Sequence, residues 1–264
     1  NITQPDEEVV AEAANRTKWI IDTFELSSGF EAIVRIYEGD SEEDLVPVTL
    51  YVYGGPDSNE ALDKFEYYPD AIGYKHAIVH IDVRGSGMRG WNYRSQTYGR
   101  LVTVEVDDTL EAMKMVLDKY PRLDKNRVGV DGWSYGGTMV LALVEKAPPA
   151  FFKCAISGAP VTNFLYYWAW YTETYIGDAP ASSYVDLTVD VSKFNTTKLL
   201  LVHGLRDDNV HFRHSAVLAE ALQQADIPFE FMVYPNQDHR FHRSGKVSAH
   251  VRHLLESFLS KCYE

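Results

Sequence analysis

From residue 48 onward, short apolar runs alternate with longer amphipathic stretches. Nearly continuous apolar runs are typical of strands buried on both faces, as in a parallel sheet. The longer stretches repeat apolar residues at helical spacing, as Val106, Leu110 and Met113 do. This order predicts one α/β domain with a mostly parallel central sheet and helices on both faces. The expected strands are 48–53, 77–83, 127–131, 154–157, 199–203 and 229–234, and the expected helices are 104–120, 138–146, 214–224 and 247–261.

The N-terminal part follows a different pattern. Residues 1–18 are acidic and lack a strong apolar stripe, which indicates a linker or a peripheral segment. The stretches 19–27 and 30–37 alternate apolar and polar residues around a Ser-Gly pair, which predicts a hairpin. The acidic run 38–44 is expected to be a loop.

Charge excludes several classes of partner. The chain of 264 residues carries a formal net charge of −13, so its surface repels nucleic acid and anionic membranes. No stretch reaches the roughly 20 apolar residues of a membrane span. With 45% hydrophobic and 24% charged residues, the composition is that of an ordinary domain with a sizeable core.

The sequence Gly-Trp-Ser-Tyr-Gly at 132–136 stands between an expected strand and an expected helix. A serine at such a turn has its hydroxyl clear of the sheet, and small residues two positions away let strand and helix approach closely. A chance match in a turn is the competing interpretation, but the strand, the helix and the further Gly137 argue against it. Ser134 is therefore the expected nucleophile, and the amide of Tyr135 is an expected oxyanion donor.

A serine hydroxyl keeps its proton at neutral pH, so it needs a histidine base that a carboxylate orients. In this strand–turn–helix arrangement the acid and then the base follow the serine along the chain. The expected strand 199–203 is followed by Asp207 and Asp208, and the strand 229–234 by His239. His239 is thus the expected base, whereas the pattern alone does not choose between the two aspartates.

The other histidines of the C-terminal half have ordinary explanations. His203 precedes the acid and is expected to be structural, and the rest can be surface or helix-face residues: His211, His214, His242, His250 and His253. Histidines at 211/214 and at 239/242 could pair on a metal, but no supporting carboxylate spacing accompanies them. We therefore expect no metal site and no organic cofactor.

Cysteines and sequons bear on the compartment. Cys154 and Cys262 are too few for a disulfide scaffold or a zinc cage, although they could form one bridge. Asn-x-Ser/Thr sequons, the acceptor pattern of N-glycosylation, begin at Asn1, Asn15 and Asn195. Together these features favour a secreted or lumenal protein, or one on the extracellular face of the membrane.

Over roughly residues 30–264 the chain resembles the prolyl oligopeptidase family, most closely its dipeptidyl peptidase IV branch. The resemblance implies that residues 1–264 form a catalytic domain with the α/β-hydrolase fold. It also implies a serine peptidase that cleaves peptides after a penultimate proline or alanine through an acyl-enzyme. The motifs that carry it, in the family's order, are Tyr-Val-Tyr-Gly-Gly-Pro at 51–56, Asp-Val-Arg-Gly-Ser-Gly at 82–87, Gly-Trp-Ser-Tyr-Gly-Gly at 132–137, His-Gly at 203–204 with Asp-Asp-Asn-Val-His-Phe at 207–212, and Asp-His at 238–239.

The resemblance also implies roles for single residues. It selects Asp207 as the acid and makes the hydroxyl of Tyr53 a second oxyanion donor. Asn209 would bind a backbone carbonyl of the substrate. A pocket for the penultimate proline would have apolar walls, which bind a rigid apolar ring without unpaired polar groups; its residues would be Tyr135, Val161, Tyr167, Tyr171 and Val210.

Further implications concern the rest of the molecule. Cys154 and Cys262 stand where the branch has a bridge between the core and the C-terminal helix, and that helix often contributes to a homodimer. Arg240 follows the candidate base where the family usually has Gly, so a cation stands beside it. The family's β-propeller has no counterpart in this chain and would belong to another part of the same polypeptide. These departures keep two alternatives open: a retired hydrolase domain that acts as a binding or scaffold protein, and a general esterase or acyl-peptide hydrolase.

Overall fold

The computed structural model describes residues 19–39, 41–62, 75–178, 185–242 and 246–264. The expected linker at 1–18, with the sequons at Asn1 and Asn15, lies outside them. The described strands are β1 (Trp19–Glu25), β2 (Glu31–Tyr37), β3 (Val46–Tyr51), β4 (Ala77–Asp82), β5 (Leu123–Trp133), β6 (Cys154–Gly158), β7 (Lys198–Gly204) and β8 (Glu230–Tyr234). The described helices are α2 (Trp91–Arg94), α3 (Val104–Lys119), α4 (Tyr135–Lys146), α5 (Ala169–Ile176), α6 (Arg213–Gln224) and α7 (Ser248–Tyr263), with 3₁₀ turns at Ser95–Thr97, Phe164–Tyr166 and Ser192–Thr196.

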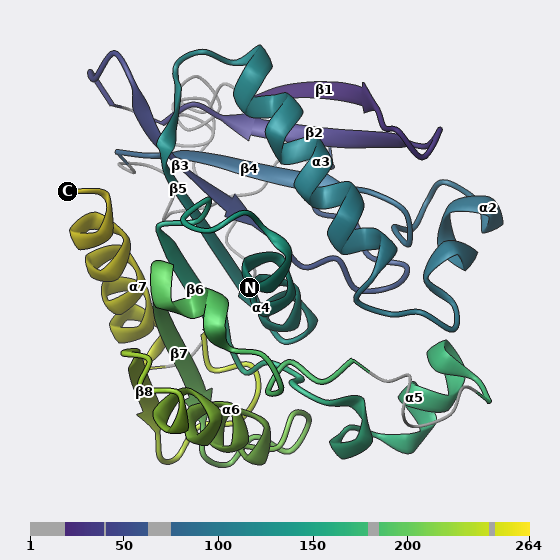
Figure 1. The fold of residues 1–264 in the computed structure, drawn as a ribbon, viewed down its shortest axis with the longest axis vertical. Helices are drawn as coiled ribbons and strands as arrows, with labels where there is room; N and C mark the ends of the chain where they lie inside the picture. The colour runs from purple at the N-terminus through teal and green to yellow at the C-terminus, as the bar shows by residue number, and fades with distance from the viewer. Residues whose placement is uncertain (1–18, 40, 63–74, 179–184, 243–245) are drawn as a thin grey trace, which may run out of the picture.

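All the described strands join one eight-stranded sheet in the order β1-β2-β4-β3-β5-β6-β7-β8 (Figure 1). From β4 to β8 the neighbours pair in parallel. The expected hairpin forms β1 and β2 and joins β4 antiparallel. Its turn contains Gly29 at φ 77°, a backbone conformation that glycine adopts without steric cost. The expected mostly parallel sheet is confirmed.

Helices cover both faces of this sheet, as expected. Along β7, Leu199 and Leu201 belong to the larger buried cluster, which includes residues of α3, α4 and α6. The alternating residues Leu200 and Val202 belong to a second cluster with residues of α7. Because successive strand side chains point to opposite faces, the two clusters are the two sides of the sheet. The apolar runs of the sequence thus become strands with two buried faces.

Some expectations need correction. The run that becomes β8 was expected to be buried on both faces, but Glu230 is exposed and the next three residues are only half-buried. The reason is position, because β8 is the outer strand of the sheet and one side lacks a neighbour. The helices α2 and α5 were not expected. Both are short, and α5 consists largely of aromatic and polar residues without a clear apolar stripe.

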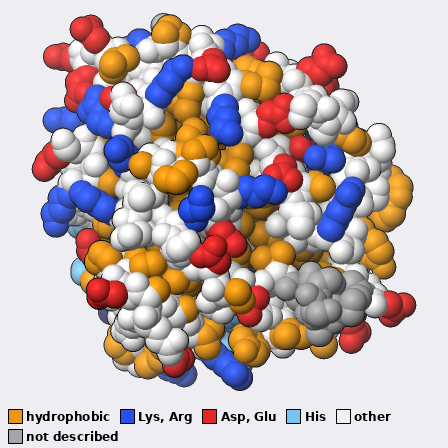
Figure 2. All heavy atoms as spheres, viewed as in Figure 1, with side chains coloured by type: hydrophobic (Ala, Val, Ile, Leu, Met, Phe, Trp, Pro, Cys, Tyr) orange, Lys and Arg blue, Asp and Glu red, His pale blue; other side chains and the backbone are white. Residues whose placement is uncertain are grey.

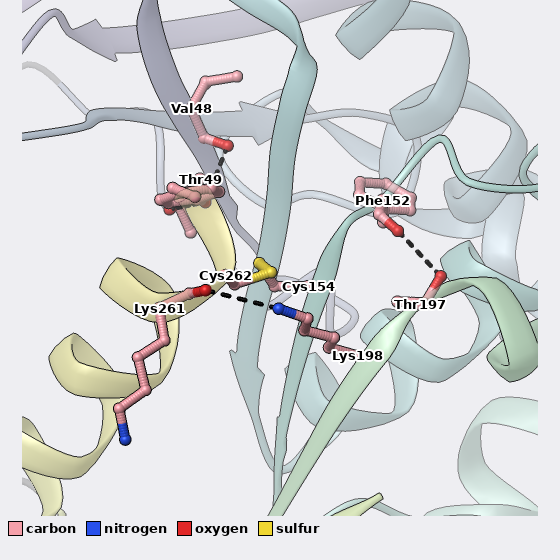
Figure 3. The surroundings of a disulfide bond; sticks show 9 residues. Val48, Thr49, Phe152, Cys154, Thr197, Lys198, Lys261 and Cys262 are labelled. Atoms are coloured by element: carbon pink, nitrogen blue, oxygen red, sulfur yellow. Dashed lines mark hydrogen bonds between the residues drawn. A yellow bond between two sulfur atoms is a disulfide. The ribbon is translucent and has the colours of Figure 1, made fainter. Parts of the chain in front are cut away.

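A disulfide joins the last helix to the sheet. Cys154 begins β6, Cys262 lies in the last turn of α7, and their Cα atoms are 6.2 Å apart across a sequence separation of 108 (Figure 3). Nearby, the Lys198 ammonium donates to the carbonyl of Lys261 at 3.5 Å. The pairing that the resemblance implied is therefore present, and it holds α7 against its face of the sheet.

Removing this disulfide is expected to lower the free energy of unfolding of the domain. We expect replacement of Cys154 and Cys262 together by Ala to cost about 2–4 kcal/mol, because a long covalent loop restricts the unfolded chain. In a domain of this size the thermal midpoint would fall by roughly 5–15 °C. Thermal unfolding of both proteins, with and without reductant, measures this. An unchanged midpoint in the variant, or no effect of reductant on the wild type, would contradict the prediction.

None of the described helices combines the length and the apolar character that a bilayer crossing requires. On the face seen in Figure 2, acidic and basic side chains are interspersed, and hydrophobic side chains reach the surface at the edge that carries α2. Met88, Trp91 and Tyr98 are among the most exposed large apolar residues of the described chain. Exposed apolar side chains that gather on one side of a protein are typical of a contact surface.

Candidate active site

Ser134 lies at the sharp turn between β5 and α4, with φ 61° and ψ −121°. A non-glycine residue in this region is strained and persists only where its surroundings enforce the conformation. The flanking glycines make the turn possible, because a Cβ on Gly136 would overlap the carbonyl of Val52 and one on Gly132 would overlap Gly136. The amide of Ser134 donates to the carbonyl of Gly158 at 2.8 Å, which ties the turn to β6.

His239 links Ser134 to Asp207. Its Nε2 lies 2.9 Å from the Ser134 Oγ, and its Nδ1 lies 2.7 Å from the Asp207 Oδ2. The three side chains follow β5, β7 and β8, and the carboxyl ends of parallel strands meet at one edge of the sheet. The Trp133 Nε1 donates to the carbonyl of His239 at 3.0 Å and so ties the histidine to the residue before Ser134. This arrangement can activate a hydroxyl for acyl transfer.

Asp207 is held as an ionised acceptor. Its Oδ1 accepts hydrogen bonds from the amides of Asn209 at 3.0 Å and Val210 at 2.8 Å. Burial alone would raise the pKa of Asp207, but hydrogen bonds from His203, His239 and the Val210 amide outweigh burial and hold it well below its ordinary value. Asp208, by contrast, is exposed. The structure therefore places Asp207, not Asp208, against the histidine.

His203, at the end of β7, contacts the candidate acid. It is fully buried, and its Nε2 lies 2.8 Å from the carbonyl of Val210 and 3.3 Å from the Asp207 Oδ2. A carbonyl can only accept, so this nitrogen carries the proton and both oxygens receive it. Its Nδ1 lies 2.7 Å from the Ser215 Oγ on α6. The expected structural residue thus positions the candidate acid, a contact that no local sequence signal indicates.

Tyr135 is anchored by a buried glutamate that the sequence analysis missed. The Tyr135 hydroxyl donates to the Glu105 Oε1 at 2.7 Å, and the amides of Val102 and Thr103 donate to the same carboxyl group. Burial raises the pKa of Glu105, and these hydrogen bonds oppose the rise. In the sequence Glu105 is an ordinary acidic residue in the first turn of a helix. In the structure it fixes the residue whose amide is the expected oxyanion donor.

Most of the residues expected to form the proline pocket come from the segments after β6 and β7, whereas Tyr135 follows β5. Val161 and Val210 are buried, whereas Tyr167 and Tyr171 are half-buried with ring centroids 5.2 Å apart. The Tyr167 hydroxyl donates to the Asn209 Oδ1 at 2.9 Å. Burial raises the pKa of Tyr167 to about 12, so it remains a protonated donor at neutral pH.

A hollow of about 310 Å³ opens at Ser134 and His239. Tyr53, the expected second oxyanion donor, lines it, and its ring centroid lies 6.3 Å from that of Tyr135. Arg240 also lines it. A larger hollow of about 660 Å³ lies beside the chain's last helix and includes Cys262, but its lining holds no serine and no histidine. The remaining residues around the smaller hollow are Tyr51, Val52, Ser58, Glu60, Trp133, Asn209 and His242.

Other expected sites can be placed. Within the described parts of the chain, no three His, Cys, Asp or Glu side chains gather as metal ligands would. Of the histidines weighed for a metal, His214 is fully buried rather than on the surface, and its Nδ1 accepts from the amide of Thr162 at 3.1 Å. The sequon residue Asn195 is exposed in its 3₁₀ turn, as a glycan acceptor must be.

A sequence profile of the prolyl oligopeptidase family matches residues 71–264. The chain belongs to this family. Dipeptidyl peptidase family member 1 of Caenorhabditis elegans is 46% identical over 254 residues, which cover 92% of this chain and 31% of that protein. Venom dipeptidyl peptidase 4 of Vespa velutina is 33% identical over 253 residues, with 92% and 32% covered. These relatives confirm the resemblance to the dipeptidyl peptidase branch.

Solved structures agree with the sequence comparison. Dipeptidyl peptidase 4 of Porphyromonas gingivalis superposes with a TM-score of 0.85 at 27% identity, over 97% of this chain and 38% of that one. A putative dipeptidyl aminopeptidase IV of Bacteroides ovatus gives a TM-score of 0.80 at 26% identity, with 93% and 36% covered. The α/β-hydrolase fold of this prolyl oligopeptidase family member is thereby confirmed. The chain spans about a third of the length of the relatives it matches.

Proposed function

We propose that this chain is the catalytic domain of a serine peptidase that forms an acyl-enzyme on Ser134. The hydrogen-bonded set in which His239 contacts Ser134 through one ring nitrogen and Asp207 through the other carries the proposal. Relatives named dipeptidyl peptidases support a peptide amide as the bond that is attacked.

Each residue has a distinct part in the proposed reaction. The Ser134 Oγ attacks the scissile carbonyl while His239 takes its proton, and Asp207 stabilises the imidazolium that forms. The Tyr53 hydroxyl and the Tyr135 amide donate to the oxyanion of the tetrahedral intermediate. His239 then gives the proton to the leaving nitrogen, the carbon–nitrogen bond breaks, and a water activated by the same histidine releases the acyl group.

We also propose that the acyl half of the substrate ends in proline or alanine at the second position. Val161 and Val210 with Tyr135, Tyr167 and Tyr171 can provide an apolar wall for a rigid ring. Asn209, held by Tyr167, would donate to a substrate carbonyl. The names of the relatives favour removal of dipeptides, a selectivity that would also require a site for the free amino terminus.

The test is covalent labelling of the full-length protein with a fluorophosphonate, followed by comparison of amides. We expect one equivalent of phosphonyl group on Ser134, with fluoride as the leaving group. We also expect an X-Pro amide to be cleaved with a kcat/KM about tenfold or more above that of the matched X-Leu amide. Absence of labelling would favour the scaffold alternative. Hydrolysis of simple acyl esters with no preference for X-Pro amides would favour a general esterase.

The proposal extends to a further domain, to the location of the protein and to its oligomeric state. The chain covers about a third of its relatives, so we infer that the protein contains a further domain, such as the family's β-propeller. The exposed apolar residues near α2, together with Trp168 and Trp170 near α5, would be covered by it. The disulfide and the exposed Asn195 support a secreted or lumenal location with a glycan at that residue. The C-terminal helix would contribute to a homodimer.

A further inference from the structure

Arg240 lies at the rim of the candidate active site and has no partner for its guanidinium among the described residues. It directly follows His239, and its amide donates to the Asp238 Oδ1 at 3.0 Å, which fixes the turn. Its side chain is exposed, and within the described residues no ion pair or hydrogen bond holds its guanidinium. The guanidinium of Arg84, by contrast, is paired, since it donates two hydrogen bonds of 2.7 Å to the carboxylate of Asp108. A guanidinium without an internal partner can bind a carboxylate from outside.

The side chain of Arg240 lines two hollows, and His239 lines both of them as well. It lines the 310 Å³ hollow that contains Ser134 and His239. It also lines a neighbouring hollow of about 330 Å³ that contains Trp168 and Asn209. A ligand that contacts the candidate base therefore lies within reach of Arg240.

Few of the residues expected to bind the acyl half of the substrate line the 310 Å³ hollow. Of the residues expected to bind the acyl half, only Asn209 lines it besides Tyr53 of the oxyanion site. Its other walls include Trp133, Tyr51 and Glu60. The two halves of a peptide leave the scissile carbonyl in opposite directions, and His239 must touch the leaving nitrogen to protonate it. If Tyr167 and Tyr171 hold the acyl half, this hollow receives the first residues of the leaving peptide.

We propose that Arg240 selects peptides whose first residue after the scissile bond is Asp or Glu. The guanidinium would donate two N–H groups to the side-chain carboxylate in a forked ion pair while His239 protonates the adjacent nitrogen. The net charge of −13 repels an acidic peptide from the domain as a whole, and the cation of Arg240 opposes that repulsion locally. The inference rests on the proposed peptidase function and adds the leaving-side preference to it.

The test uses full-length protein and C-terminally amidated peptides that share one X-Pro acyl half and differ only in the next residue, Glu, Gln or Lys. We expect the wild type to cleave the Glu peptide with a kcat/KM about three- to fivefold above the Gln peptide, a ratio set by an exposed ion pair. The ratio should fall toward one in high salt. Amidation leaves the side chain as the carboxylate next to the scissile bond, so a free C-terminus cannot produce the effect.

Two variants and a control decide the assignment. Arg240→Gln is expected to bring the Glu/Gln ratio to about one, and Arg240→Glu to favour the Lys peptide. Arg122→Gln removes the same charge near the opposite end of β5 and should keep the wild-type ratio. A wild-type ratio near one, or a preference that survives in Arg240→Gln, would overturn the assignment. In either case cleavage of the peptides keeps the peptidase proposal, whereas failure of cleavage together with failure of Ser134 labelling would refute both.

Discussion

Replacing Ser134 with Ala is expected to abolish cleavage of an X-Pro amide, with a fall in kcat of about a million-fold. The variant removes the only atom of the set that attacks the carbonyl, whereas His239 and Asp207 keep their mutual hydrogen bond. Alanine keeps the Cβ, so the strained turn at this position has the same steric demands. Steady-state turnover of the full-length protein measures the effect, and thermal unfolding should show a fold of nearly wild-type stability.

A second serine variant serves as the control for the Ser134→Ala variant. Ser192 is exposed in the 3₁₀ turn Ser192–Thr196, which lies just before the start of β7 and therefore far from the carboxyl ends of the strands. Ser192→Ala is expected to keep wild-type turnover. Wild-type turnover in Ser134→Ala would refute the nucleophile assignment, because no other described residue is placed to attack through His239.

Replacing Asp207 with Asn is expected to lower kcat about ten-thousand-fold with little change in KM. The amide group cannot stabilise the imidazolium, and its NH₂ group would disfavour the His239 tautomer that accepts the serine proton. The neighbouring Asp208 supplies the control, because it is exposed and the sequence pattern alone did not distinguish the two. Asp208→Asn should stay within about threefold of wild type. Equal losses in the two variants would contradict the assignment of the acid.

The ionised carboxylate of Asp207 should also make the free energy of unfolding depend on pH. Its pKa is lowered in the folded state, so the stabilisation from ionised Asp207 is present above its unfolded pKa of about 4 and is lost as the pH falls through the lower folded value. The free energy of unfolding of wild type should therefore approach that of Asp207→Asn as the pH drops below about 4. Chemical denaturation between pH 2 and pH 7 checks this together with the kinetic measurement.

The sequence indicated the sheet and the order of the candidate residues because both depend on local patterns. Apolar runs mark strands with two buried faces, and the turn at Ser134 requires glycines at fixed offsets. The position of β8 at the outer side of the sheet has no such marker, so its exposed Glu230 was not anticipated. Helix α5 was missed because its aromatic residues follow no helical stripe.

The parts of the site that were missed are contacts between distant segments. Glu105 and Tyr135 are thirty residues apart, and either one alone has an ordinary explanation in its own helix. His203 contacts Asp207 only because the loop after β7 folds back onto the strand. The choice of Asp207 over Asp208 likewise needed either the family resemblance or the geometry. Hydrogen bonds of this kind leave no periodic signal in a single sequence.

The last helix, α7, is synthesised after the strands of the sheet, and the sheet depends on a contact from it. The Tyr263 hydroxyl lies 2.7 Å from the Thr49 Oγ1 and donates to the carbonyl of Val48 at 3.2 Å, and it stands where a side chain on Gly129 would be. These partners lie in β3 and β5, the strands that support Ser134. A chain still inside the ribosome lacks this contact, so the centre of the sheet is completed only after translation has passed Tyr263. If Ser134 acts as proposed, the strands that support it would gain their last contacts only after this helix has been synthesised.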